Sequence, residues 1–158
     1  MIQRKQSIYL FLAAIAMALD FIFPIAKFIG AGSYQLELYI YQVVSLVPDT
    51  PPPFDVMFVA PLTALTGSVL LGSLITIFIY RKRVIQAKLV RGLLLLTLGD
   101  LALIFFYNIP TLEKLSNNTA EYNYAGIAMP LVAMVLLILA MNGIIKDEKL
   151  VRSADRLR

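Results

Sequence analysis

Residues 56–108 read VMFVAPLTALTGSVLLGSLITIFIY, then RKR, then VIQAKLVRGLLLLTLGDLALIFFYN. Two apolar runs are joined here by a short basic turn, Arg81-Lys82-Arg83, so we expect two antiparallel helices that lie side by side. Each run is long enough to cross the roughly 30 Å hydrocarbon core of a bilayer at about 1.5 Å per residue. This stretch therefore predicts a membrane-spanning helical hairpin.

Two further apolar runs flank the hairpin, which gives four expected spans at residues 7–29, 56–80, 87–108 and 124–145. All but two of the 14 basic residues lie before the first span, between the second and third or in the first turns of the third, or after the fourth; the exceptions are Lys27 and Lys114. The positive-inside bias selects such a pattern, because the cytoplasmic leaflet is anionic. We therefore predict an all-α, multi-pass protein of the bacterial inner membrane, a four-helix bundle with both termini in the cytoplasm.

The composition agrees with a membrane protein and excludes several classes of function. Hydrophobic residues make up 59% of the 158-residue chain and charged residues 15%, whereas soluble domains have about 45–50% and about 25%. The net charge of +4 is explained by residues that flank the spans, so we expect lipid headgroups and not nucleic acid as the partner. The chain has no Cys and no His, no phosphate-binding loop and no nucleophile beside a base, so we expect no enzyme, cofactor or metal site.

The regions between the spans predict a small outer cap and an inner tail. In the first outer loop, 30–55, residues 34–41 alternate with period two and predict a strand. In the second, 109–123, residues near Glu121 predict a strand that pairs with the first loop. The tail, 146–158, keeps a helical pattern and is expected to extend the last helix into the cytoplasm. A cleaved signal peptide is a weaker interpretation of the N-terminus, because the apolar run continues past Ala18.

Two carboxylates interrupt the spans. Asp20 lies nine residues before Ile29 and Asp100 eight residues before Asn108, so both are expected at one depth in the outer half of the membrane. Buried acids are costly in lipid and often functional, and a facing pair would share a proton or respond to a cation. The competing interpretations are a structural hydrogen bond to the hydroxyl of Thr97, Ser68 or Ser73 or to a backbone carbonyl, or contact with a basic residue of a partner protein.

Two other groups of residues are candidates for contacts. Small residues at four-residue spacing predict close helix packing, and they are Ala14, Ala18, Ala64, Ser68 and Gly72. Basic residues of the inner turn and tail predict a surface for anionic lipid headgroups, and they are Arg81, Lys82, Arg83, Lys149, Arg152 and Arg156. Lys27 is expected to reach the outer interface or an acid of the outer loops.

The two ends of the chain resemble a bacterial membrane family. Met1-Ile2-Gln3-Arg4, the QSIYL segment from Gln6, and the closing sequence IIKDEKLVRSADRLR from Ile144 are similar to the terminal signatures of domain of unknown function 4293, found in Bacteroidota. The resemblance covers the whole length and implies a four-helix inner-membrane protein. It implies no catalytic or binding residue, because none is established for that family.

These observations favour a non-enzymatic accessory or structural subunit of a larger complex of integral membrane proteins, because four short-looped helices leave little room for a private substrate path. Two alternatives remain. One is a small homo-oligomeric transporter or channel that uses Asp20 and Asp100. The other is a lipid- or envelope-sensing protein that uses its basic tail.

Overall fold

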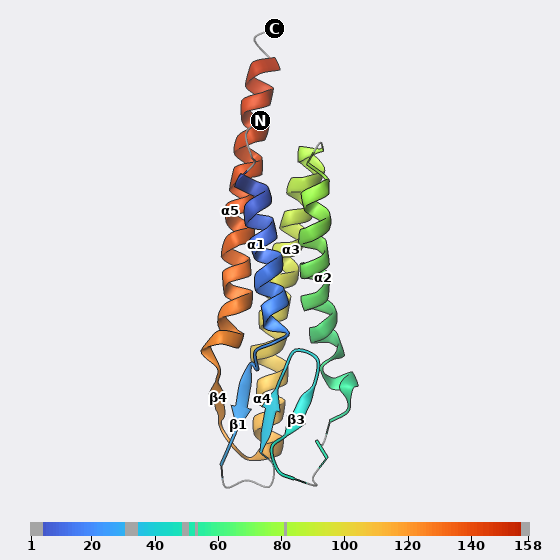
Figure 1. Cartoon of the computed structure of the whole chain (residues 1–158), viewed down its shortest axis with the longest axis vertical. Coiled ribbons are helices and arrows are strands. Elements are labelled where there is room, and N and C mark those ends of the chain that lie inside the picture. Colours follow the sequence, from blue (N-terminus) through green and yellow to red (C-terminus); the bar gives the residue numbers. More distant parts are fainter. Residues whose placement is uncertain (1–4, 31–34, 49–50, 53, 81, 156–158) are drawn as a thin grey trace.

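The computed structural model describes residues 5–30, 35–48, 51–52, 54–80 and 82–155. The molecule is elongated, with a bundle of helices at one end and a small β-sheet with a short helix at the other (Figure 1). Both the start of the first helix and the end of the last helix lie at the end of the bundle far from the sheet. The fold is therefore mostly helical, with a compact cap at a single end.

Four long helical segments build the bundle. The first is α1, and the second is α2 with a short 3-10 turn, η1, before it. The third is a continuous segment that passes from α3 through a π-helical turn, η2, into α4, and the fourth is α5. Their bounds are Lys5–Asp20 (α1), Val56–Phe58 (η1), Ala60–Phe78 (α2), Arg83–Leu103 (α3), Ile104–Asn108 (η2), Ile109–Ser116 (α4) and Tyr124–Asp155 (α5).

Three of these segments are long and apolar enough to cross a membrane, namely 60–78, 83–116 and 124–150. Helix α1 has 16 residues, about 24 Å at 1.5 Å per residue, and it falls short of the usual span of about 20 residues. Helix α5 continues into the tail as far as Asp155, as the helical pattern of the tail predicts.

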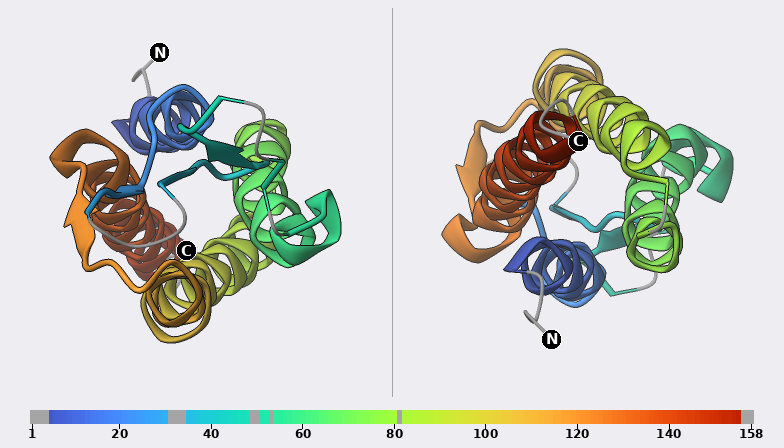
Figure 2. Two further views of the ribbon diagram at one scale, coloured as in Figure 1. Left: turned by 90° about the horizontal axis from the view of Figure 1, so that it is seen from below. Right: turned by 90° about the horizontal axis from the view of Figure 1, so that it is seen from above.

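The helices form a closed ring in which each packs against two others: α1 against α2 and α5, and α3 against the same two (Figure 2). The ring is filled by apolar side chains, and large ones such as Leu10, Met17 and Leu137 are fully buried. A second apolar cluster lies under the sheet and includes Phe28, Leu38 and Ile109. Two adjoining cores thus hold the bundle and the cap.

The first helix is shorter than the apolar run that contains it, and Pro24 supplies the reason. Proline has no N–H to donate to the carbonyl of Asp20, and its ring disfavours helical backbone before it. Helix α1 therefore ends at Asp20, and the chain forms strand β1 at Ala26–Phe28. The helix expected over 7–29 therefore stops nine residues early, because Pro24 ends it instead of kinking it.

The third helix is longer than expected, and the predicted outer loop at 109–123 begins too early. Pro110 cannot donate to the carbonyl of Phe106, so a regular ladder cannot pass this point. The chain widens into the π turn, where the N–H of Ile109 donates to the carbonyl of Ile104. Helix α4 then continues to Ser116 and ends at Asn117, which has the left-handed φ of 57°.

The cap is a four-stranded antiparallel sheet with strand order β3-β2-β1-β4. Besides β1, its strands are Leu36–Leu38 (β2), Val43–Ser45 (β3) and Ala120–Tyr122 (β4). Strand β2 lies inside the alternating segment and β4 overlaps the segment predicted near Glu121. However, β4 pairs with β1 and not with the first loop. The prediction missed this partner because it placed residues 26–28 in the first membrane helix. Strand β3 was not predicted.

Gly126 is the tightest junction between the bundle and the cap. A β-carbon there would collide with the carbonyl group of Pro24, which is backbone and cannot move aside. We expect Gly126→Ala to lower the free energy of unfolding by about 1–3 kcal/mol, the usual cost of overpacking. Thermal or denaturant unfolding in detergent measures this change.

Gly67 provides the matched control, because it lies within α2 and a β-carbon there meets no atom within 4 Å. Gly67→Ala should leave stability unchanged or raise it by up to about 1 kcal/mol, since alanine is the better helix former. Equal effects of the two substitutions would contradict the close approach of α5 to Pro24.

Candidate functional site

The two carboxylates singled out in the sequence lie close together. Asp20 is the last residue of α1, Asp100 lies in the last turns of α3, and both side chains are fully buried. They are near enough for their charges to interact. The structure thus brings together two acids that are 80 positions apart in the chain. They meet where the bundle joins the cap.

Helix α2 supplies a hydrogen bond to this pair. The hydroxyl of Thr66 lies 2.9 Å from Oδ1 of Asp100 and 3.0 Å from the carbonyl oxygen of Leu62. The hydroxyl has one hydrogen, so it can donate fully to only one of these two acceptors at a time. The sequence suggested Thr97, Ser68 or Ser73 as a partner, but Thr97 donates to the carbonyl of Leu93 and Ser68 to that of Ala64. Thr66 is therefore the residue that sequence reasoning missed.

Three carboxylate oxygens remain without a hydrogen-bond partner within the described part of the chain: both of Asp20 and Oδ2 of Asp100. In addition, none of the ion pairs described for this chain involves either acid. Burying a charge without a partner is strongly unfavourable. A bound proton or small cation would lower this cost. Among the described residues, no group of three or more His, Cys, Asp or Glu side chains lies close enough together to hold a metal ion.

Further polar groups lie along the surface where α2 and α3 are in contact. The buried face of α2 carries Thr66, Ser73 and Thr76 at spacings of seven and three residues. Near the end of the bundle far from the sheet, Nε2 of Gln86 donates to the carbonyl of Thr76 over 3.1 Å. The hydroxyl of Ser73 has no partner among the described residues. The helices α2 and α3 therefore meet along a polar seam, although the surrounding core is apolar.

The small residues predicted to pack helices together divide into two groups. Ala14 is buried in the ring, and Gly72 lies directly against the side chain of Leu93 on α3. By contrast, Ala18, Ala64 and Ser68 are exposed. Of the predicted face of α2, Gly72 therefore packs against another helix, whereas Ala64 and Ser68 point away from the buried face, which follows Leu62, Thr66 and Val69.

Four of the six basic residues predicted for the cytoplasmic surface lie on or beside elements at the end of the bundle far from the sheet (Figure 1), namely Lys82, Arg83, Lys149 and Arg152. Lys82 and Lys149 are exposed, whereas a guanidinium nitrogen of Arg83 donates to the carbonyl of Asp147 on α5 over 3.0 Å. The carboxylate of Asp147 also accepts from Nε2 of Gln6, so α1, α3 and α5 are tied at this end. Arg152 lies on α5, and Arg81 and Arg156 lie outside the described residues.

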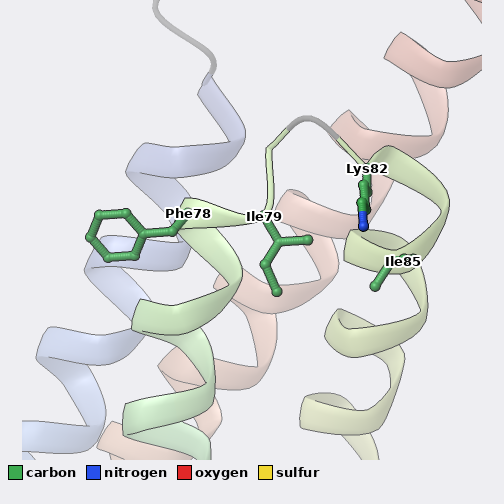
Figure 3. Close-up of a pocket in the computed structure, with 4 residues that line it drawn as sticks. All are labelled: Phe78, Ile79, Lys82 and Ile85. Atoms are coloured by element: carbon green, nitrogen blue, oxygen red, sulfur yellow. The ribbon is translucent and has the colours of Figure 1, made fainter.

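Two surface cavities open near this basic end. The first, of about 360 Å³, lies between the end of α2 and the start of α3, where Ile79 and Ile85 face it and Lys82 lies above Ile85 (Figure 3). The second, of about 380 Å³, lies between α3 and α5 and is lined by apolar residues and Arg91. Both combine an apolar wall with one cation.

At the opposite end of the molecule, Lys27 contacts an acidic residue of the cap. The sequence led us to expect either such an acid or the outer membrane interface as its position. In the sheet it lies between Glu37 of β2 and Glu121 of β4, and its Nζ is 3.0 Å from Oε1 of Glu37. The hydrogen bond and the charge of Glu37 raise the pKa of Lys27. Burial, followed by the charge of Glu37, raises the pKa of Tyr39 nearby. The ion pair of Lys27 and Glu37 therefore joins the two central strands of the sheet.

Aromatic rings collect where the bundle meets the cap. Phe54 stacks on Phe58 with ring centroids 4.3 Å apart, and Phe58 contacts Tyr107 at 5.5 Å. Phe106 and Tyr124 are almost fully exposed, at 84% and 89%. Tyrosine and phenylalanine at one level of an apolar bundle are typical of a membrane–water interface.

Comparison with known families places this chain. The family described as domain of unknown function, DUF4293, matches residues 2–157. The chain belongs to the DUF4293 family. This confirms the resemblance seen at its two ends, and it shows that the middle of the DUF4293 chain also follows the family pattern. A search of curated proteins finds no match.

The hydrogen bond between Thr66 and Asp100 can be tested in the DUF4293 protein itself. Thr66→Val keeps the shape but leaves Oδ1 of Asp100 without its donor, so we expect the free energy of unfolding to fall by about 1–3 kcal/mol. Unfolding in mixed micelles measures this. Thr66→Ser keeps the hydroxyl and should cost clearly less. If the two variants are equally stable, Thr66 contributes through packing alone.

Proposed function

We propose that this DUF4293 protein crosses the bacterial inner membrane four times, with both termini in the cytoplasm and the sheet outside. Three helices have the required length, and Phe21-Ile22-Phe23 extends the apolar segment of α1 beyond its end. Exposed cations such as Lys5 and Lys82 lie at one end of the bundle, and the aromatic rings lie at the other. From Lys88 to Phe106 the helical segment rises about 27 Å, which is close to the thickness of a hydrocarbon core.

Within this membrane, the protein acts as a non-enzymatic structural subunit of a larger assembly. The observation that carries this proposal is a small-residue surface of α2, formed by the exposed Ala64 and Ser68 and by Gly67, where an added β-carbon would meet no atom within 4 Å. Small residues allow another backbone to approach closely, which is the main means by which helices associate in lipid. No helix of the described chain uses this surface. A helix of another subunit is the partner that fits it.

The absence of cysteine from the chain allows a direct test of this surface. Ser68→Cys, labelled with a thiol-reactive photo-cross-linker and irradiated in native membranes, should link to a different polypeptide, giving a product heavier than the monomer of 17.6 kDa. Mass spectrometry of the product identifies the partner. A product of twice the monomer mass would show that the partner is a second copy, which contradicts the accessory-subunit role.

Val132→Cys is the matched control. Val132 is exposed on α5 and, like Ser68 on α2, lies eight residues beyond the start of its helix. It should therefore lie at a similar depth but face lipid. Cross-linking of both positions to the same proteins would indicate random collision, and cross-linking of neither would remove the support for the α2 surface.

The proposed topology predicts which positions are accessible from each side. Lys114→Cys, exposed on α4, should react with a membrane-impermeant maleimide in intact cells. Lys82→Cys, exposed at the turn between α2 and α3, should react only after the cells are lysed. Labelling of Lys82→Cys in intact cells would place the basic end outside and overturn the proposed orientation.

A homo-oligomeric transporter is the second candidate, and it is favoured by the three carboxylate oxygens of Asp20 and Asp100 that lack partners. A translocated proton or small cation would satisfy them. This function requires that Asp20→Asn and Asp100→Asn abolish flux in reconstituted vesicles while the protein still assembles. If the unaltered protein assembles in the vesicles but carries no flux, the result favours the structural subunit.

A further inference from the structure

A groove runs along the outside of the bundle between α3 and α5, which lie side by side in the ring (Figure 2). Its volume is about 380 Å³. Arg91 lines one end, and the walls are apolar: Leu94, Leu95 and Leu98 from α3, and Met134, Ile138 and Met141 from α5. The groove is therefore a strip of hydrocarbon surface that ends at one cation.

The groove has a direction relative to the bundle. Helix α3 leads from Arg91 towards the cap, and Leu98 lies seven residues further on, about 10 Å along the axis. Helix α5 runs the opposite way and returns from Met134 to Met141 over the same length. The cation therefore lies at the basic end of the bundle, and the apolar walls extend from it towards the middle of the proposed membrane.

Arg91 is available for an external anion. Its side chain is exposed, and it forms no ion pair with any residue that the structure describes. Leu95 and Leu98 are also exposed, at 71% and 57%. Arginine binds phosphate through two parallel N–H···O bonds, which a lysine cannot reproduce. A charged site of this kind at the end of an apolar groove fits an amphipathic anion.

We propose that this groove binds one anionic phospholipid of the inner leaflet, with its phosphate on Arg91 and an acyl chain along the leucine and methionine walls. The proposal rests on the membrane orientation given above but not on the existence of a protein partner. Basic sites between helices on the cytoplasmic side are suited to acidic headgroups. The flexible side chains of Met134 and Met141 can adapt to a mobile acyl chain.

The cavity beside Lys82 is a poorer candidate for the same ligand. Figure 3 shows that Phe78 points away from Ile79, Lys82 and Ile85, so the apolar wall is short. Its cation is a lysine, which offers a point charge in place of the planar guanidinium of Arg91. We therefore assign the lipid to the α3–α5 groove.

Native mass spectrometry of the full chain in a neutral detergent tests this assignment. Phosphatidylglycerol and phosphatidylcholine with the same acyl chains are added in turn, and the bound fraction is measured for each. We expect the unaltered protein to bind one phosphatidylglycerol about five- to tenfold more tightly than phosphatidylcholine. Equal binding of the two lipids by the unaltered protein would overturn the proposal, whatever the variants show.

Three variants locate the site. Arg91→Gln should remove the preference for phosphatidylglycerol. Lys88→Gln, which changes the net charge equally three residues earlier on α3 but does not line the groove, should keep it. Leu98→Trp should fill the groove and weaken both lipids. Equal loss in Arg91→Gln and Lys88→Gln would show general attraction to a basic surface and contradict a defined site.

Inorganic phosphate separates the headgroup from the whole lipid. It should not displace bound phosphatidylglycerol at concentrations that leave the protein intact, because the acyl chain supplies much of the contact. Displacement by phosphate alone would show that the site recognises a free anion and not a lipid. Failure of Ser68→Cys to find a partner protein would leave all of these results unaffected.

Discussion

The backbone of Pro24 and Ile25 holds the two parts of this molecule together. Pro24 ends α1 because it cannot continue the helical hydrogen bonds, and its carbonyl group lies against Gly126 at the start of α5. The N–H of Ile25 donates to Leu38, and its carbonyl accepts from Asn123. Two consecutive residues thus join the first helix, the sheet and the last helix. The position of the cap and the depth of Asp20 follow from this junction.

The polar seam between α2 and α3 sets a second constraint, because most of the bundle interior is apolar. Thr66 satisfies one oxygen of Asp100, whereas Asp20 has no partner in the described chain. A stable membrane bundle gains little from such an acid pair, since buried charges are costly. Apolar packing alone therefore does not explain why these two acids are present in the core. It also explains why a transporter remains the best competitor of a structural subunit.

The two proposed binding surfaces lie on different sides of the ring. The small-residue surface belongs to α2, whereas the lipid groove lies between α3 and α5, and α2 and α5 occupy opposite corners (Figure 2). A neighbouring subunit and a bound phospholipid can therefore be present together. In this view the DUF4293 protein is a small structural component whose different faces contact protein and lipid.

The sequence by itself determined the helical hairpin, the last helix with its tail, strand segments in both loops and the basic end, because these depend on local periodicity and on charge next to apolar runs. It also indicated that Asp20 and Asp100 share a depth. Only the tertiary structure decided that 26–28 is a strand, since its apolar residues fit a buried strand as well as a helix. Likewise, only packing decided that Thr66 faces Asp100 while Ala64 and Ser68 face outward. The rotation of a helix about its axis depends on its neighbours, and the four-residue spacing that suggested a buried face is equally compatible with an exposed one.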